Sequence, residues 1–217
     1  MTLAEENYLK AIFHLEYESE GEVSTNAIAE RMETKPSSVT DMVQKLGEKD
    51  LLVYKRYKGV QLTEEGRKLA AYVIRKHRLW EVFLVDKLNF HWDEVHEIAE
   101  QLEHIQSEEL IIRLNAYLGN PDFDPHGDPI PDENGVLKRT EKKLLSDLEK
   151  NQYGICVGVK ESSADFLQYL DKKKISIGTK ILVLGKEFFD GSMIIRVGEN
   201  QFFISIKIAE NLYVQTA

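Results

Sequence analysis

The chain has 217 residues, of which 42% are hydrophobic and 30% are charged, and its formal net charge is −9. These values are typical of a globular protein with one to three domains. The sequence contains no run of about 18 uncharged apolar residues, so no membrane span is predicted. The start MTLAEENYLK lacks the basic and apolar pattern of a signal peptide, so we expect a cytoplasmic protein. The single cysteine, Cys156, excludes an intramolecular disulfide framework and a cysteine-based zinc site, and YGICVGV predicts that it is a buried strand residue.

Charge is distributed unevenly along the chain. Segment 35–78 holds 11 basic and 5 acidic residues, whereas segment 79–152 holds 7 basic and 17 acidic residues. Segment 1–34 is acidic and segment 153–217 is nearly neutral. A basic block beside an acidic one predicts two different kinds of charged partner.

The N-terminal third predicts helices followed by a hairpin. Apolar residues recur at helical spacing over 5–17, and Gly21 is expected to end that helix. Ser24 is a candidate N-cap for a short helix through Met32, and Pro36 suits the first turn of the next helix.

The next helix, PSSVTDMVQKLGEKD, has one apolar face and one polar face. Its apolar face is predicted to be buried and consists of Val39, Met42, Val43 and Leu46. In LLVYKRYKGVQLT, two short apolar runs flank the basic segment 55–59, which predicts a hairpin with a basic tip. Helices followed by such a hairpin form the pattern of a winged helix-turn-helix.

The middle of the chain predicts two long helices and a loop. Segment 64–88 has helical spacing, and Asp93 is expected to cap a second helix that runs to about Gly119. Four of the five prolines lie in 121–131, which predicts an irregular loop.

The last 75 residues or so predict a small antiparallel β-barrel of SH3-like size. Residues 204–208 alternate apolar and polar with the period of a strand, and turns are expected at Gly178, Gly185, Gly191 and Gly198. The predicted fold class is therefore mainly α with a β-rich C-terminal domain. The predicted domains are a winged helix-turn-helix (1–74), a helical domain (75–120), a proline-rich linker (121–140) and an SH3-like domain (141–217).

The stretch HEIAEQLEH, residues 96–104, carries a possible metal site. If it is one helix, His96, Glu100, Glu103 and His104 share an arc of about 100°. The preceding helix carries a histidine and a glutamate four residues apart, at 77 and 81. Oxygen and nitrogen ligands without thiolate suit Mn²⁺, Fe²⁺ or Zn²⁺.

Two other interpretations of this stretch stay open at this point. A solvated acidic helix surface accounts for several of the glutamates without any metal. A zinc-protease motif, HExxH, begins at His96 but fails at Glu100, where the second histidine is required.

The chain resembles the metal-dependent repressors of the diphtheria-toxin-repressor and manganese-transport-regulator type. The resemblance covers essentially the whole chain through six motifs in order. They are NYLKAIFHL, PSSVTDMVQKL, LTEEGRKLA, RKHRLWEVFL, VHEIAEQLEH and HGDPIP. It implies a winged helix that binds DNA, helices that dimerise and bind metal, and an SH3-like domain of the FeoA type.

The resemblance also implies two sets of metal ligands. The primary, regulatory set is Asn7, Glu100, Glu103 and His104. The ancillary set is His77, Glu81, His96 and Asp165.

Two of these positions bear on the choice of metal. Iron-responsive members have cysteine where this chain has Glu100, and manganese-responsive members have glutamate, so Glu100 indicates Mn²⁺. At residue 7, manganese regulators have Asp and iron regulators Met, whereas this chain has Asn7, whose amide oxygen can bind a hard cation without adding charge. Lys10 excludes the second ligand that shorter manganese regulators place at that position. Fe²⁺ is the alternative, and Zn²⁺, Co²⁺ or Cd²⁺ can be expected to occupy the sites in vitro.

The resemblance predicts a homodimeric repressor of metal-uptake genes that binds a palindromic double-stranded operator, with no membrane and no catalytic residues. The residues expected to contact bases or phosphates are Lys35, Ser37, Ser38, Thr40, Gln44, Lys45, Lys55, Arg56 and Lys58. Two alternatives are a helical metal enzyme and a winged-helix sensor of a small organic ligand. The basic wing, and the lack of paired Glu-x-x-His motifs on four helices, disfavour the enzyme.

Overall fold

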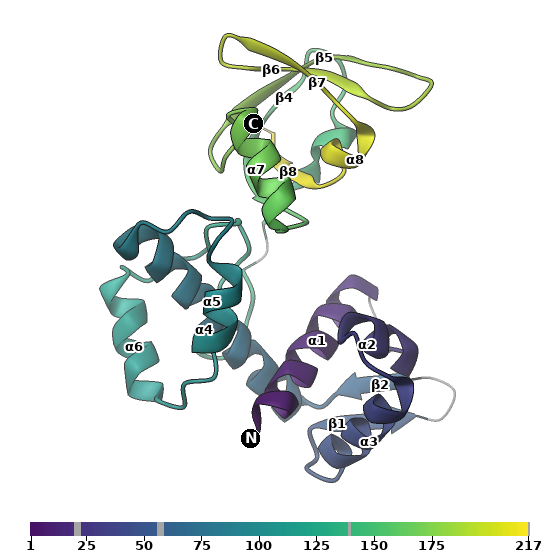
Figure 1. Cartoon of the computed structure of the whole chain (residues 1–217), viewed down its shortest axis with the longest axis vertical. Helices are drawn as coiled ribbons and strands as arrows, with labels where there is room; N and C mark the ends of the chain where they lie inside the picture. Colours follow the sequence, from purple (N-terminus) through teal and green to yellow (C-terminus); the bar gives the residue numbers. More distant parts are fainter. Residues whose placement is uncertain (20–22, 56–58, 139, 217) are drawn as a thin grey trace. The chain divides into compact units, whose positions relative to one another are not determined.

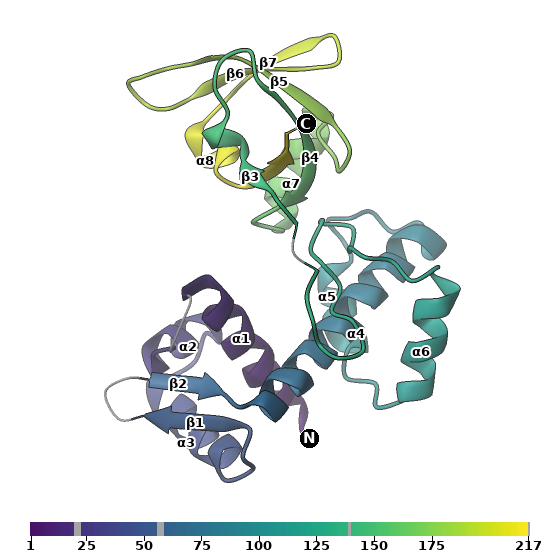
Figure 2. The same cartoon turned by 180° about the vertical axis from the view of Figure 1, so that it is seen from behind.

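The computed structural model describes residues 1–19, 23–55, 59–138 and 140–216 (Figure 1; Figure 2 gives the reverse view). They form two compact units. The first unit consists of Met1–Trp80, Glu100–Arg113 and Ile130–Leu137. The second consists of Glu81–Ala99, Leu114–Pro129 and Lys138–Ala217. Among the helices of the described residues, none is long and apolar enough to cross a membrane. The bounds of the four predicted domains stay a prediction.

The winged helix-turn-helix predicted for the N-terminal third is present in the first unit. Its elements are α1 (Leu3–Ser19), α2 (Thr25–Arg31), α3 (Pro36–Gly47), β1 (Leu52–Lys55) and β2 (Gly59–Leu62). The Ser24 hydroxyl caps α2 by accepting the N–H of Ala27 at 3.1 Å, and Pro36 opens α3, as predicted. The position of Gly21 lies outside the described residues.

One apolar core holds these elements together. Leu9 and Ile12 of α1, Ile28 of α2, and Val39 and Leu46 of α3 are buried at 0% exposure. Burying each such side chain contributes roughly 1.5–3 kcal/mol relative to exposure. The predicted inner face of α3 is confirmed for Val39, Val43 and Leu46, which are buried, whereas Met42 is half-buried at the edge of the core. Figure 2 shows β1 and β2 as a two-stranded hairpin, which the residue pairing confirms as antiparallel.

The predicted long helix is confirmed as α4 (Glu64–Leu88), but the single helix predicted for 93–119 is wrong. The chain forms α5 (His96–Leu102) and α6 (Glu108–Tyr117) instead. The Ser107 hydroxyl accepts the N–H of Leu110 at 3.3 Å, so a new helix starts there, and two glutamates in its first turn favour the start.

Two consequences of this break correct the sequence-based interpretation. Glu103 and His104 lie in the turn after α5, so they do not share a helix face with His96 and Glu100. Asp93 stands three residues before α5 and accepts a hydrogen bond from Gln168 Nε2 at 2.8 Å, so it is not the helix cap.

The second unit contains the predicted small antiparallel β domain. Its six-stranded sheet has the order β3-β8-β4-β5-β6-β7. The elements are β3 (Lys143–Leu144), a 3-10 turn η1 (Leu145–Asp147), β4 (Tyr153–Val159), α7 (Ala164–Lys172), β5 (Lys180–Lys186), β6 (Met193–Val197), β7 (Asn200–Ile204), α8 (Ile206–Ala209) and β8 (Leu212–Gln215).

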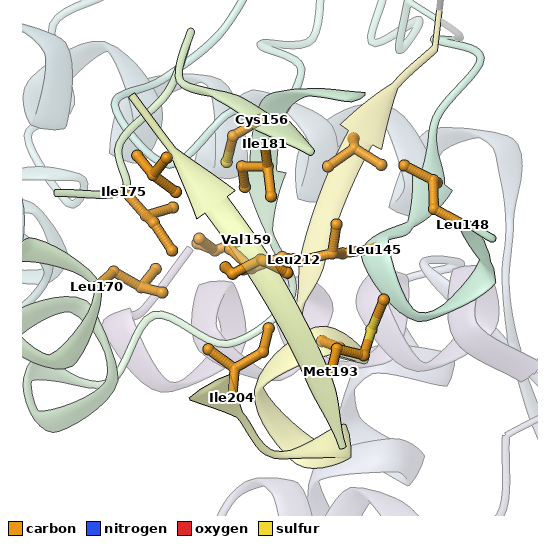
Figure 3. Packing of buried hydrophobic residues seen from close by; sticks show 14 of the residues in the cluster. Leu145, Leu148, Cys156, Val159, Leu170, Ile175, Ile181, Met193, Ile204 and Leu212 are labelled. Atoms are coloured by element: carbon orange, nitrogen blue, oxygen red, sulfur yellow. The ribbon is translucent and has the colours of Figure 1, made fainter. Parts of the chain in front are cut away.

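Its core lies between the sheet and the helices. Figure 3 shows Leu170 of α7, Met193 of β6 and Leu212 of β8 gathered in one cluster, each buried at 0% exposure. Cys156 lies in the same cluster on β4, as predicted, and burial raises the pKa of its thiol to about 11. Because a buried thiol with a raised pKa is rarely a thiolate, we expect Cys156 to be unreactive.

Two details of this domain differ from the prediction. Residues 206–208 were expected in a strand, but Ser205 accepts the N–H of Ile208 and starts the short helix α8. Gly185 was expected in a turn, but it lies within β5 where the register shifts. The turns at Gly178, Gly191 and Gly198 are confirmed, each with a positive φ.

Candidate metal centres and nucleic-acid interface

A buried ionic cluster in the first unit surrounds Glu103. This carboxylate is fully buried, and Lys10 Nζ of α1 donates to its two oxygens at 2.7 and 2.9 Å. The same ammonium lies 3.4 Å from Glu100 Oε1, and His77 Nδ1 of α4 lies 2.6 Å from Glu103 Oε2. The structure therefore brings the predicted primary ligands Glu100 and Glu103 together around a lysine.

The charge of Glu103 is set by its partners. Burial by itself raises the pKa of this carboxyl, but the hydrogen bond from His77 and the charge of Lys10 outweigh it, and the pKa is lowered. Glu103 is therefore an anion at neutral pH, which is the form that binds a cation.

His104 is oriented toward the same cluster by Glu6. His104 Nδ1 lies 2.6 Å from Glu6 Oε2, and Gln106 Nε2 donates to the other Glu6 oxygen at 2.8 Å. With the Nδ1 proton donated to Glu6, the lone pair of His104 is on Nε2, which lies 3.8 Å from Glu103 Oε1. A carboxylate behind a histidine in this way is the usual support of a metal-binding imidazole.

Asn7 of α1 provides a buried acceptor without a hydrogen-bond partner among the described residues. Its Oδ1 atom is buried and accepts no hydrogen bond from any described residue. An unsatisfied buried acceptor costs roughly 1–3 kcal/mol, so such an atom in a native site calls for an explanation. Asn7 precedes Lys10 by three residues and so shares its helix face. The orphaned oxygen, two carboxylates and an oriented imidazole fit a hard divalent cation.

A second candidate metal site lies within the second unit. Glu81, Asp124 and His126 are all buried, and one ligand atom from each lies within 4.8 Å of the others. His126 Nδ1 is 3.6 Å from Glu81 Oε2, and His96 Nδ1 is 3.5 Å from Glu81 Oε1. Burial lowers the pKa of His126, but the carboxylate of Glu81 outweighs it and raises the pKa to about 9. A metal cation could replace the His126 proton as the positive partner of the Glu81 and Asp124 carboxylates.

The proline-rich loop holds Asp124 and His126 in place. Asp124 Oδ1 accepts the backbone N–H groups of His126 and Asp128 at 2.8 and 2.9 Å. His126 Nε2 donates to the carbonyl oxygen of Trp92 at 2.8 Å, and the rings of Trp92 and His126 are stacked 6.1 Å apart. The ring orientation is therefore fixed by Trp92, through both its carbonyl oxygen and its ring.

Gly127 allows this loop to approach the β domain closely. Its φ is +84°, and a Cβ atom there would lie 2.1 Å from the carbonyl oxygen of Val157 on β4. In the same loop, the carbonyl oxygen of His126 accepts a hydrogen bond from the N–H of Val159 at 3.0 Å. No side chain larger than hydrogen fits at this contact.

The predicted ancillary ligands are placed as follows. His77 precedes Glu81 by one helical turn on α4 and contacts Glu103, while Glu81 contacts His96. Asp165 lies in the first turn of α7 and is exposed. Within the part of the chain that the structure describes, it does not join Glu81 in any cluster of three or more possible metal ligands. Asp124 and His126 were missed as ligands, although the motif HGDPIP, which contains His126, marked the segment.

The polar face of α3 is exposed, as a DNA-reading helix requires. The exposed residues include every predicted contact of this segment: Lys35, Ser37, Ser38, Thr40, Gln44 and Lys45. Lys45 also lies 3.2 Å from the buried carboxylate of Glu5, which Lys49 approaches at 2.7 Å. The hydrogen bond from Lys49 is the main cause that lowers the pKa of Glu5 to about 2. Lys45 therefore stabilises the fold besides its predicted DNA contact.

The wing tip is only partly described. Lys55 ends β1, whereas Arg56 and Lys58 lie outside the described residues. Their predicted phosphate contacts stay predictions.

A chain that combines a winged helix with buried clusters of carboxylate and imidazole has the features of the metal-binding, winged-helix regulators. The N-terminal DNA-binding domain of the iron dependent repressors matches residues 1–60, and their metal binding and dimerisation domain matches residues 63–132. The FeoA domain matches residues 143–216. The chain belongs to the family of metal-dependent transcriptional repressors that includes the diphtheria toxin repressor and MntR.

Individual relatives support this assignment. The HTH-type transcriptional regulator MntR of Oceanobacillus iheyensis is 32% identical over 145 residues, which are 67% of this chain and 96% of the relative. The iron-dependent repressor IdeR of Mycobacterium tuberculosis is 42% identical over 127 residues, which are 58% of this chain. The chain spans about half the length of that relative, 54%.

Solved structures agree over nearly the whole chain. A manganese-dependent transcriptional repressor in complex with manganese has a TM-score of 0.86 at 31% identity, covering 98% of this chain and all of that chain. ScaR with bound Cd²⁺ has a TM-score of 0.82 at 33% identity, covering 98% of this chain and 99% of that chain. The predicted fold class is confirmed.

Proposed function

We propose that the protein is a metal-activated, DNA-binding transcriptional repressor of metal-uptake genes, with Mn²⁺ as corepressor. The observation that supports the proposal is the primary cluster, in which Glu103 lies close to His104 and Lys10, together with the buried, unpartnered Oδ1 atom of Asn7 on the same face of α1 as Lys10. We infer that it acts in the cytoplasm as a homodimer on a palindromic operator. The match to a metal binding and dimerisation domain supports the dimer.

Four residues would hold the cation of the primary site: Asn7, Glu100, Glu103 and His104. A divalent cation supplies concentrated positive charge that joins oxygen and nitrogen ligands. Asn7 lies on α1, whereas Glu103 and His104 lie in the turn after α5, so joining them restrains the helix against that turn. The arrangement that has all four ligands in place is then favoured in the population, and DNA binding is coupled to metal binding.

In that arrangement α3 would enter the major groove. Ser37, Ser38, Thr40 and Gln44 would contact bases or phosphates, and Lys35, Lys45, Lys55, Arg56 and Lys58 would contact phosphates. A two-fold symmetric dimer presents two such helices to successive major grooves, which explains the palindrome.

The donor set favours Mn²⁺ over Fe²⁺. Glu100 supplies a hard carboxylate at the position that is cysteine in iron-responsive members, and Cys156 is buried in the core of the β domain. Fe²⁺ is the second candidate, because the family includes iron-dependent repressors such as IdeR. Operator-binding titrations with Mn²⁺, Fe²⁺ and Zn²⁺ side by side separate the two.

The second cation site would use Glu81, Asp124 and His126, with His96 as a further ligand. Its supporting observations are three buried side chains with ligand atoms within 4.8 Å and the 3.5 Å contact between His96 and Glu81. His77 and Asp165 stay proposed members of the ancillary set. Asp124→Asn with His126→Gln should lower the Mn²⁺ stoichiometry from two to one per chain, measured by equilibrium dialysis. An unchanged stoichiometry would contradict the second site.

The test of the repressor function uses a library of random DNA duplexes. Duplexes retained by the protein with Mn²⁺ are sequenced, and the enriched duplex is used in fluorescence anisotropy with and without the metal. Glu100→Ala with His104→Ala should abolish Mn²⁺-dependent binding while size-exclusion chromatography still shows the dimer. Glu109→Ala, which removes an exposed carboxylate of α6, is the matched control. Metal dependence that survives the double change would refute the primary site.

A further inference from the structure

The primary cluster already contains a cation, the ammonium group of Lys10. Its Nζ atom lies 2.7 and 2.9 Å from the two oxygens of Glu103 and 3.4 Å from Glu100 Oε1. The lysine side chain is only 15% exposed, and the Glu103 side chain is 0% exposed. These are the two carboxylates assigned to the cation of the proposed function, on which this inference rests.

Asn7 and Lys10 are alternatives on one face of α1. They are three residues apart, so both face the turn after α5. In the structure Lys10 makes three short contacts with the carboxylates, whereas the buried Oδ1 atom of Asn7 has no hydrogen-bond partner among the described residues. The same helix face can therefore be joined to these carboxylates by an ammonium or, through a cation, by an amide oxygen.

The two modes exclude each other for electrostatic reasons. A divalent cation bound by Glu100 and Glu103 would lie within a few ångströms of the Lys10 ammonium, and like charges at that distance in a partly buried site repel each other. The lysine has a flexible four-carbon stem and can move its charge to solvent. Metal entry is therefore an exchange of one cation for another.

We propose that Lys10 is a tethered competitor that occupies the primary cation site and sets the metal concentration at which the site fills. In the metal-free state it neutralises part of the charge of Glu100 and Glu103 and joins α1 to the turn after α5. On metal binding it is displaced, and Asn7 takes over the connection. Removing its charge should tighten metal binding.

The experiment measures Mn²⁺ binding directly, without DNA. Free Mn²⁺ is followed by electron paramagnetic resonance in a chain carrying Glu81→Gln, which removes the second site. In that background Lys10→Gln should lower the Kd for Mn²⁺ by about tenfold or more. Lys10→Arg keeps the positive charge and should stay within a few-fold of the parent. Lys68→Gln removes an equal charge from an exposed ion pair and should change the Kd by less than twofold.

A thermal readout accompanies the binding curve and reports on folding. Without metal, Lys10→Gln should lower the Tm because Glu103 loses its partner, and saturating Mn²⁺ should raise the Tm by more than it does in the parent. An unchanged or weaker Mn²⁺ affinity in folded Lys10→Gln would overturn the proposal and make Lys10 a residue that positions Glu103. If the parent and the Lys10→Gln chain both bind no Mn²⁺, the proposed function itself fails, so the two failures are distinguishable.

Discussion

Replacement of Glu103 by glutamine should destabilise the metal-free protein by about 2–4 kcal/mol. Glu103 is fully buried, and it accepts two hydrogen bonds from Lys10 and contacts His77 at 2.6 Å. Hydrogen bonds to charged groups contribute roughly 1.5–3 kcal/mol, and removal of one partner of a buried ion pair costs roughly 3–5 kcal/mol. The estimate lies below the sum of these values, because glutamine can still accept one hydrogen bond and Lys10 can reach solvent.

The assay is urea unfolding followed by circular dichroism at fixed protein concentration, with and without Mn²⁺. The matched control is Glu109→Gln, whose carboxylate pairs with Arg113 on the exposed face of α6 and should contribute at most about 1 kcal/mol. Mn²⁺ should stabilise the parent and have a much smaller effect on Glu103→Gln, because the variant lacks a charged ligand. Destabilisation no larger than that of the control would refute the reasoning that Glu103 organises the cluster.

Three further predictions concern the helix cap, pH and DNA. Ser107→Ala should cost about 1 kcal/mol in urea unfolding, because the cap of α6 is lost; no change would show that the cap contributes nothing. Burial, followed by the charge of Arg78, lowers the pKa of His14 in the folded protein to about 3. Because the unfolded chain then binds a proton that the folded protein does not, the free energy of unfolding should fall by about 2 kcal/mol between pH 6.5 and pH 4.5. His14→Gln should reduce this dependence on pH. Lys35→Ala should weaken DNA binding and lower its salt slope by about one, whereas an unchanged slope would exclude a phosphate contact.

The elements predicted well from the sequence are those decided by local signals. Ser24 and Pro36 mark helix starts through backbone chemistry that acts within three residues, and both act as predicted. The 3.6-residue spacing of apolar residues gave α4 with its observed bounds. Alternation and turn glycines gave a small β domain, although not its order of strands.

Other features depended on contacts that no local pattern contains. No glycine or proline marks the end of α5, and the side chains that follow it are bound by Lys10, His77 and Glu6. Ser107 carries a cap signal, but the helical spacing of its neighbours masked it. Residues 206–208 show the same conflict, in which a serine cap prevails over an alternating pattern.

The second candidate site shows why ligands from a loop are hard to predict. Asp124 and His126 lie in a proline-rich segment that sequence reasoning takes for a linker, and Glu81 lies more than 40 residues earlier. Only the folded loop, held by hydrogen bonds to the Trp92 carbonyl and by the close approach of Gly127, brings them together. Spacing rules work for ligands on one helix, and this set is not on one helix.

The proposed exchange at Lys10 also accounts for an amide at residue 7. Glu6 is balanced by the buried ammonium of Lys76 at 3.9 Å, so the charge that remains is that of Glu100 and Glu103. The formal charges of these two carboxylates and the Lys10 ammonium sum to −1, and with a divalent cation in place of Lys10 they would sum to zero. An aspartate at residue 7 would leave the metal-bound cluster with an extra buried anion, whereas the neutral Asn7 leaves it balanced. The tethered lysine and the uncharged ligand are therefore consistent parts of one site. Asn7→Asp is expected to strengthen the binding of the Lys10 ammonium at this site as well as the binding of the metal.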